Sequence, residues 1–439
     1  MSHDLAITDV FGWGAFDSRG NPTVACLVRL SNGGEGAVVV PSGASKGRHE
    51  AHELRDGGTR FGGRGVTGAV HNVNVVLRPV VIGRDPRNRV ELDRALRDVD
   101  GTPNLTVIGA NAILSVSLAT ALAVADGDRE PLYRSLLGAS PPLLPLPMVN
   151  ILSGGAHAAG AVDIQDVLAI PIGATSFAQS MEWVWEVRRA TQDVLRSSGM
   201  GLAASLVADE GGLAAELRSN AEAIETVLAG IDRAGLRAGT DVAIGLDVAA
   251  TELQASPSGP YLFACEQRQV STDELVEVVT TWCSDYPIVS VEDPLGEDDW
   301  RGWRQISAAL HGRVQLVGDD LLVTDDNRLS TAVEQDVANA ILIKPNQAGS
   351  LEAAHRAVRA AREAGYSTVV SARSGDTEDS WLADLAVGWR AGQIKVGSTT
   401  RSERLSKYNR LLRIEVEEGA TASFAGAAAL AGYSGGADG

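Results

Sequence analysis

The stretch Ile288-Val289-Ser290-Val291-Glu292 is a short β-branched run that ends in an acidic side chain. Continuous apolar runs of this length are typical of parallel strands that are buried on both faces. Runs of this kind alternate with helix-length segments after Thr240, over residues 242–248, 288–292, 315–318, 340–343, 367–370 and 393–396. Strand and helix units in series predict part of an α/β fold of the β/α-barrel type.

A charged residue stands at or just past the end of each predicted strand. The first three are acidic and the next three are basic: Asp247, Glu292, Asp319, Lys344, Arg373 and Lys395. Barrel enzymes build their sites at the carboxyl ends of several strands, so we expect these side chains to converge. Separate strand-end ion pairs would explain any one of them, but not all six in phase.

Three converging carboxylates repel one another unless a cation neutralises them. Hard oxygen ligands that leave coordination positions open suit magnesium, and we therefore predict a magnesium site at Asp247, Glu292 and Asp319. A lysine beside a metal and a second lysine has its ammonium form disfavoured, so the pKa of Lys344 is expected to fall towards neutrality. Lys344 is the predicted base, and it would remove a proton next to a substrate carboxylate.

The first 140 residues have another pattern. Segments 23–30 and 36–40 read as paired strands around the turn at 31–34, and a Gly/Ser-rich loop follows at 41–47. Helices are predicted near 66–81, 90–98 and 110–127, and the proline-rich segment 141–147 reads as a linker. We therefore expect an N-terminal α+β capping domain over residues 1–140 and a barrel domain over residues 141–439.

The net charge of −18 over 439 residues argues against nucleic acid or an anionic membrane as a partner, although a local pocket can still bind an anionic small molecule. No basic segment followed by a long apolar run opens the chain, and no apolar run approaches about 20 residues. Cys26, Cys265 and Cys283 lack metal-type spacing and read as reduced thiols. The expected location is the cytoplasm.

Several motifs of this chain resemble the enolase family, and the resemblance runs nearly from end to end. They are Asp17-Ser18-Arg19-Gly20-Asn21-Pro22-Thr23-Val24, Pro41-Ser42-Gly43-Ala44-Ser45, Gly109-Ala110-Asn111-Ala112-Ile113-Leu114, Asp209-Glu210-Gly211-Gly212, Val291-Glu292-Asp293-Pro294, Gly318-Asp319-Asp320 and Arg401-Ser402-Glu403-Arg404. The resemblance implies an enolase-type barrel, two magnesium ions, an anionic three-carbon substrate, and a homodimer or homo-octamer.

The resemblance also implies a role for each matching residue. Asp247, Glu292 and Asp319 would hold the first magnesium, and Ser45 would bind the second together with the substrate phosphate. Lys344 would be the base and Lys395 would hold the substrate carboxylate. The phosphate would be bound by Arg373 and Ser374, with His157 nearby. Glu210 would protonate the leaving hydroxyl, on the side of the site that also contains Gln165 and Asp166.

The chain departs from the family pattern at three positions. Asp166 stands where the family has glutamate, Ala372 where it has histidine, and Lys46 where it has threonine or a similar small residue. The first change withdraws a carboxylate by one methylene, roughly 1.5 Å, and the second removes a polar group and opens space. Both lie on the side that expels the hydroxyl, whereas the predicted metal ligands and base are retained.

These departures favour a diverged enzyme of specialised metabolism over a true enolase. The paralogue with the expected properties is carboxyphosphonoenolpyruvate synthase of phosphonate biosynthesis, whose co-substrate is carried on a nucleotide. The alternative is a true enolase that interconverts 2-phosphoglycerate and phosphoenolpyruvate, with the two changes neutral. A third hypothesis, a non-catalytic binding protein on an enolase fold, conflicts with the retention of every predicted ligand and both lysines.

Overall fold

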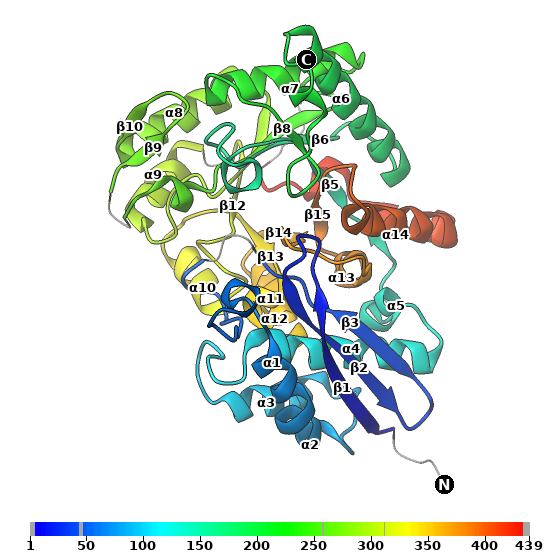
Figure 1. The fold of residues 1–439 in the computed structure, drawn as a ribbon. Coiled ribbons are helices and arrows are strands. Elements are labelled where there is room, and N and C mark those ends of the chain that lie inside the picture. Colours follow the sequence, from blue (N-terminus) through cyan, green and yellow to red (C-terminus); the bar gives the residue numbers. More distant parts are fainter. Residues whose placement is uncertain (1–4, 44–46, 257–258, 311, 433–439) are drawn as a thin grey trace.

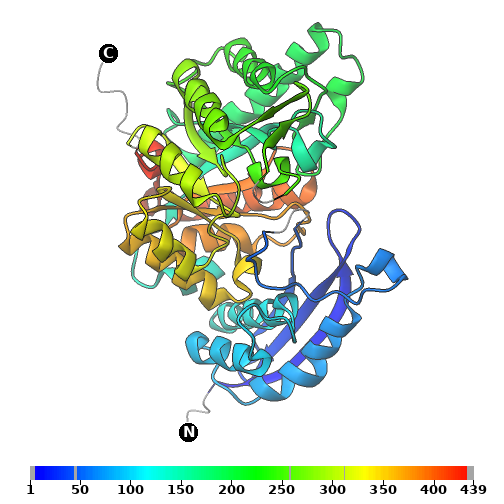
Figure 2. The same cartoon turned by 90° about the vertical axis from the view of Figure 1, so that its left-hand side faces the viewer.

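The computed structural model describes residues 5–43, 47–256, 259–310 and 312–432. The elements up to residue 137 form an α+β layer, and the elements from residue 143 onward form a barrel beside it (Figure 1). Turned by 90°, the N-terminal sheet and its helices lie below the barrel (Figure 2). The predicted fold class, a β/α barrel with an N-terminal α+β part, is confirmed.

The N-terminal layer is built on an antiparallel sheet with the strand order β1-β2-β3. Its strands are β1 (Ile7–Phe16), β2 (Pro22–Leu30) and β3 (Glu35–Val39). The two predicted strands agree with β2 and β3 within one residue at each end, while β1 was not predicted. Its glycines, Gly12 and Gly14, weaken the apolar alternation by which a strand is recognised.

Helices cover one side of this sheet. They are α1 (Thr67–His71), a π-helical turn (Asn72–Leu77), α2 (Arg78–Val81), α3 (Arg89–Asp100), α4 (Ala110–Asp128) and α5 (Leu132–Leu137). Helix α4 lies so close to the sheet that a Cβ at Gly36 would be 2.2 Å from the carbonyl oxygen of Ala119. Helix α4 is also long and apolar enough to cross a membrane, but 83% of that window is buried inside the protein. Its apolar surface is therefore used for packing.

The barrel is a closed sheet with the order β5-β6-β8-β11-β12-β13-β14-β15, and β15 pairs with β5. Its strands are β5 (Leu146–Ser153), β6 (Asp166–Ile170), β8 (Ala243–Asp247), β11 (Ile288–Glu292), β12 (Gln315–Gly318), β13 (Ala340–Ile343), β14 (Ser367–Ser371) and β15 (Gly392–Gly397). The six predicted strands all occur. The sequence missed β5 and β6, and part of the segment interpreted as a linker forms β4 (Leu143–Leu144) and the start of β5.

Strand β6 runs antiparallel to both of its neighbours, β5 and β8. Asp166, the first residue of β6, is therefore in register with Asp247, the last residue of β8. The reversal brings the beginning of β6 to the end of the barrel where the other strands finish. The segment Gln165-Asp166 thus reaches the same edge as the predicted metal ligands.

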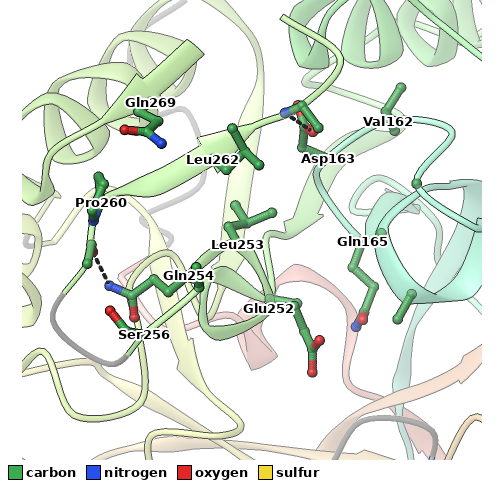
Figure 3. Close-up of a pocket in the computed structure, with 17 residues that line it drawn as sticks. Val162, Asp163, Gln165, Glu252, Leu253, Gln254, Ser256, Pro260, Leu262 and Gln269 are labelled. Atoms are coloured by element: carbon green, nitrogen blue, oxygen red, sulfur yellow. Dashed lines mark hydrogen bonds between the residues drawn. The ribbon is translucent and has the colours of Figure 1, made fainter. Parts of the chain in front are cut away.

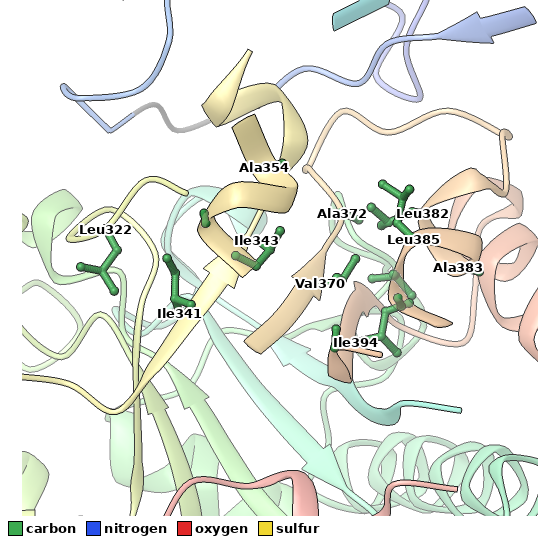
Figure 4. Close-up of a cluster of buried hydrophobic side chains, with 14 of the residues drawn as sticks. Leu322, Ile341, Ile343, Ala354, Val370, Ala372, Leu382, Ala383, Leu385 and Ile394 are labelled. Atoms are coloured by element: carbon green, nitrogen blue, oxygen red, sulfur yellow. The ribbon is translucent and has the colours of Figure 1, made fainter. Parts of the chain in front are cut away.

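The remaining elements surround the barrel. Helices are α6 (Phe177–Ser197), α7 (Asn220–Arg233), α8 (Thr272–Asp285), α9 (Trp300–Leu310), α10 (Asp326–Glu334), α11 (Pro345–Ala348), α12 (Leu351–Glu363), α13 (Trp381–Gly388) and α14 (Ser402–Glu418). Short strands are β7 (Leu213–Ala214), β9 (Tyr261–Phe263), β10 (Arg268–Val270) and β16 (Ser423–Phe424). Strand side chains such as Ile341 and Val370 pack with α12 and α13 in one hydrophobic cluster (Figure 4). Other strand side chains, among them Leu168, Val317 and Leu342, form a second cluster.

Candidate active site

Two lysines and three carboxylates meet at the carboxyl end of the barrel strands. The Nζ of Lys395 donates to Asp247 Oδ2 at 2.6 Å and to Glu292 Oε2 at 2.7 Å. The Nζ of Lys344 donates to Asp319 Oδ2. Residues 247, 292 and 319 end three neighbouring strands, β8, β11 and β12. Five of the six predicted strand-end charges thus lie in two contacting groups, Lys395 with Asp247 and Glu292, and Lys344 with Asp319.

The lysines are charged in this arrangement. Burial lowers the pKa of Lys344, but the negative charges of Asp319 and Glu292 together outweigh burial and raise it. Burial likewise lowers the pKa of Lys395, while Asp247 and Glu292 raise it well above its usual value. In this arrangement a carboxylate bonds directly to the ammonium group of Lys344. The predicted fall of its pKa towards neutrality concerns a lysine beside a bound metal and stays a prediction.

The donor set fits a divalent cation. Asp247, Glu292 and Asp319 offer only carboxylate oxygens, the hard ligands that magnesium takes. Burial and the neighbouring charge of Asp247 raise the pKa of Glu292 well above its usual value, even with Lys395 in contact. Negative charge at this position is therefore only partly compensated by the lysines, and a divalent cation would relieve the rest.

A tighter acidic group lies alongside, formed by Asp293, Asp319 and Asp320 with one oxygen from each within 4.8 Å of the others. Asp293 is committed to the backbone, because its Oδ1 accepts from the amide of Asp319 at 3.0 Å and its Oδ2 from the amide of Asp320 at 2.7 Å. Such bonds fix the turn after β12. Asp293 therefore holds the turn that presents Asp319, and its oxygens are not directed at an ion.

A second buried group combines His157, Asp166 and Glu210, with ligating atoms within 4.8 Å of one another. Asp166 Oδ2 is 3.0 Å from His157 Nδ1, and Glu210 Oε1 is 3.7 Å from His157 Nε2. Burial lowers the pKa of His157, but Asp166 and Glu210 outweigh burial and raise it to about 9. The histidine is therefore an imidazolium between two carboxylates.

Both carboxyl oxygens of Asp166 have hydrogen-bond partners. Its Oδ1 accepts from the Asn150 side-chain amide and from Ser153 Oγ, the latter at 2.9 Å. Glu210 is the other carboxylate beside His157, and its Oε1 is 4.0 Å from Arg404 Nη1. Burial raises the pKa of Glu210, but the charges of His157 and Arg404 outweigh burial and lower it. Glu210 is thus ionised in this arrangement, although a proton donor was predicted there.

Gln165 connects this group to the predicted metal ligands, because its Nε2 donates to Asp247 Oδ2 at 3.0 Å. It also borders a cavity of about 500 Å³ that extends away from the barrel mouth towards Leu253, Leu262 and Gln269 (Figure 3). Among the described residues that line this cavity there is no lysine or arginine. The charged residues that line it, Asp163 and Glu252, are acidic, so the cavity does not itself supply a cation for an anionic group.

Arg373 is buried beside the N-terminal layer. Its guanidinium donates to both carboxyl oxygens of Glu50, from Nη1 at 2.9 Å and from Nη2 at 3.2 Å. The sequence analysis did not single out Glu50, since it stands outside the strand-end pattern. Ser374, the second predicted phosphate ligand, accepts a bond from Arg404 through its carbonyl oxygen at 2.5 Å. The predictions for Ser45 and Lys46 fall outside the described residues.

Ala372 is 6% exposed. Its methyl group belongs to the same hydrophobic cluster as Leu382 and Leu385 of α13 (Figure 4). A histidine at this position would add a ring with two nitrogens to a buried, mostly apolar surrounding. Alanine therefore places an apolar methyl group, in place of a polar ring, next to Arg373 in the sequence.

Two sequence models of known domains match the chain. The enolase N-terminal domain matches residues 7–136, and the enolase C-terminal TIM barrel domain matches residues 141–432. The chain belongs to the enolase family. A relative named Enolase, from Acidothermus cellulolyticus, is 49% identical to this enolase-family chain over 423 residues, which are 96% of this chain and 97% of the relative. Membership of this family makes the chain an enzyme of the lyase class.

The comparison supports the alternative from the sequence analysis better than the favoured hypothesis. The similarity to a protein named Enolase extends over nearly the whole of both chains. Nothing in this similarity points to phosphonate chemistry or to a nucleotide co-substrate. The changes at Asp166 and Ala372 thus occur within an otherwise enolase-like sequence.

Proposed function

We propose that this protein interconverts 2-phosphoglycerate and phosphoenolpyruvate. The observation that supports this most strongly is the buried contact of Lys344 and Lys395 with three strand-end carboxylates, next to the buried cation Arg373. Removal of a proton next to a carboxylate creates a dianion, and such an intermediate needs several positive charges around it. The site concentrates them at the barrel mouth.

In this proposal Asp247, Glu292 and Asp319 would hold a magnesium ion, and Ser45 would contribute to a second. A bound magnesium would neutralise the charge that develops on the substrate carboxylate. Lys344 would take the proton from the carbon next to that carboxylate. This requires the neutral amine, and a cation that drew Asp319 away from its ammonium group would lower the pKa of Lys344. Lys395 would orient the carboxylate.

The group of His157, Asp166 and Glu210 would handle the leaving hydroxyl. As an imidazolium, His157 has a proton to donate, and the two carboxylates hold its ring in place. Glu210 would serve as the acid only when a proton is delivered to it, since its pKa is lowered in this arrangement. Asp166 would act through His157, because its own oxygens are bonded to Asn150, Ser153 and His157.

The test is incubation with 2-phosphoglycerate and magnesium while the ultraviolet absorbance of the enolpyruvate product is followed. We expect turnover of about 10 s⁻¹ or more, as is typical of enzymes. The variant Lys344→Ala should lose this activity. The variant Lys407→Met, which changes a buried lysine bonded to Asp376 rather than to the carboxylates of the site, should keep it in the fraction that folds. Absence of turnover in the unmodified protein would overturn the proposal.

A second candidate function rests on Asp166 and Ala372. Both positions depart from the family pattern, and a cavity with no lysine or arginine among its described lining residues opens beside Gln165. These features favour an enolpyruvate-forming enzyme of specialised metabolism with a larger co-substrate. The double variant Asp166→Glu, Ala372→His separates the two candidates. Under the first candidate it changes turnover of 2-phosphoglycerate less than about tenfold, and under the second it raises a weak activity by about 10²-fold, the scale of a 1 Å misplacement.

We further propose that the protein is a homo-oligomer in the cytoplasm, with residues 1–140 and 141–439 as its two domains. The family relationship supports the oligomer, since the relative covers nearly the whole chain. The burial of the apolar helix α4 supports a soluble protein. Size-exclusion chromatography with light scattering would test the assembly, and a monomer at micromolar concentration would contradict it.

A further inference from the structure

Glu50 occupies one edge of the Arg373 guanidinium. Two parallel N–H···O bonds, 2.9 and 3.2 Å long, join the guanidinium to the carboxylate. The geometry is the bidentate one by which arginine binds carboxylates and phosphates alike. The side chains are 5% and 9% exposed, so little water screens the pair. The cation expected to bind the substrate phosphate therefore already has an internal anion.

The carboxylate of Glu50 is held from other directions as well. Its Oε1 accepts from the backbone amide of Gly47 at 3.1 Å and lies 3.5 Å from the side-chain amide of Gln347. That same amide of Gln347 donates to Asp319 Oδ1 at 2.8 Å. Glu50 thus contacts Arg373 on one side and, through Gln347, the predicted metal ligand Asp319 on the other.

We propose that Glu50 is a specificity-determining residue that competes with the substrate phosphate for Arg373. The inference rests on the proposed function, in which Arg373 is a phosphate ligand. A dianionic group that enters must either displace Glu50 from part of the guanidinium or bind within a few ångströms of a like charge. Weak anions cannot offset that repulsion, whereas a phosphate held at the same time by other groups of the site can. Glu50 therefore lowers affinity for free anions and reserves Arg373 for the complete substrate.

The consequence for affinity has a definite sign. If Glu50 only supported the fold, its neutralisation would loosen Arg373 and weaken anion binding. If it competes, neutralisation leaves a buried guanidinium without its carboxylate, and anion binding becomes tighter. When a unit negative charge a few ångströms from a bound dianion is removed, the affinity for that dianion rises by more than a factor of ten at an effective dielectric constant of about 20. Loss of orientation of the guanidinium offsets part of that gain, so we expect about tenfold tighter binding.

The experiment measures binding of inorganic phosphate to the full-length protein by calorimetry, with and without magnesium. For Glu50→Gln we expect a Kd about tenfold lower than that of the unmodified protein. Steady-state kinetics with 2-phosphoglycerate should show KM and kcat falling together, because the product phosphate is also held more tightly. Calorimetry needs no turnover, so a protein inactive on 2-phosphoglycerate would contradict the proposed function while this inference is still tested.

The matched control is Glu297→Gln. Glu297 is a buried carboxylate that bonds Arg48 at 2.7 Å, close to the same N-terminal segment, and it has no bond to Arg373. The Kd of the Glu297→Gln protein for phosphate should remain within about twofold of that of the unmodified protein. If Glu50→Gln does not fold, Glu50→Asp, which keeps the charge but shortens the reach, should tighten binding by about threefold. Unchanged or weaker phosphate binding in the folded Glu50 variant would overturn the proposal.

Discussion

Replacement of Lys395 by methionine tests how the buried carboxylates are neutralised. Methionine keeps the length of the side chain and removes the ammonium group that bonds Asp247 and Glu292. Loss of one partner from a buried ion pair costs about 3–5 kcal/mol, because the remaining charges are left without compensation. With an unfolding entropy of about 2.1 cal/mol/K per residue, a chain of 439 residues loses about 3–5 °C in Tm.

Magnesium should restore much of this loss. Binding at a concentration of 100 times Kd stabilises a folded protein by about 2.7 kcal/mol, which is about 3 °C here. The unmodified protein should gain less from magnesium than Lys395→Met, because Lys395 already neutralises two of the carboxylates. Thermal unfolding is followed by calorimetry in chelator and again in excess magnesium. The gap in Tm between the two proteins should therefore narrow when magnesium is present.

Lys407→Met is the control for this experiment. Lys407 is 1% exposed and bonds Asp376 Oδ1 at 2.7 Å, so its loss should lower Tm by a similar amount. Asp376 is not among the predicted metal ligands. The difference in Tm between Lys407→Met and the unmodified protein should therefore be the same with and without magnesium. The reasoning would be refuted if magnesium narrowed the two gaps equally, or if Lys395→Met were as stable as the unmodified protein in chelator.

Three further outcomes are expected. Burial raises the pKa of Glu352, but contacts including Arg359 lower it to about 2. The ionised carboxylate therefore contributes fully to stability above pH about 4.5, and this contribution is lost as the pH falls towards 2. The Tm of Glu352→Gln should fall less steeply between pH 4.5 and 2 than that of the unmodified protein, and a parallel decline of the two Tm values would contradict this. Gly349 has φ 78° and a Cβ there would lie 2.3 Å from a side-chain carbon of Leu105, whereas Gly365 has φ 77° with open space around it. In urea unfolding, alanine should lower the free energy of unfolding by about 1–2 kcal/mol at Gly365 and by more at Gly349. Equal losses at the two positions would contradict the packing argument. Burial raises the pKa of the Cys283 thiol to about 12. At pH 8 its alkylation, followed by mass spectrometry, should be about 10³-fold slower in the folded protein than in urea. Equal rates in the two conditions would show that the thiol is not protected.

The strand-end pattern was predictable from the sequence for a physical reason. Strands buried on both faces must be continuously apolar, so a charge at the end of each one is conspicuous. Asp247, Glu292 and Asp319 were recognisable in this way because their strands are parallel to one another. The helix α4 was recognisable from its length and apolar composition, and the structure places it within one residue of the expected range.

Other features depend on relations that the linear sequence does not display. Strand β6 is a short run of four apolar residues after Asp166, and only its pairing shows that it runs in the opposite direction. The pKa of Lys344 depends on which carboxylate its ammonium group contacts. Glu50 is separated from Arg373 by 323 residues, and the contact between them requires the N-terminal layer to pack on the barrel mouth. Each of these is a property of tertiary packing.

The closure of the barrel by β15 and β5 has a consequence for the synthesis of this protein. Residues of β5 pair with β15 at Gln393↔Leu146, so the partner of that edge emerges 247 residues later (393 − 146). At about 5–20 residues per second, the edge of β5 waits about 12–50 s for its neighbour. An unpaired apolar strand edge is a template for association with other chains. The order of the strands therefore exposes the nascent chain to aggregation, and the demand for chaperones should grow as translation slows.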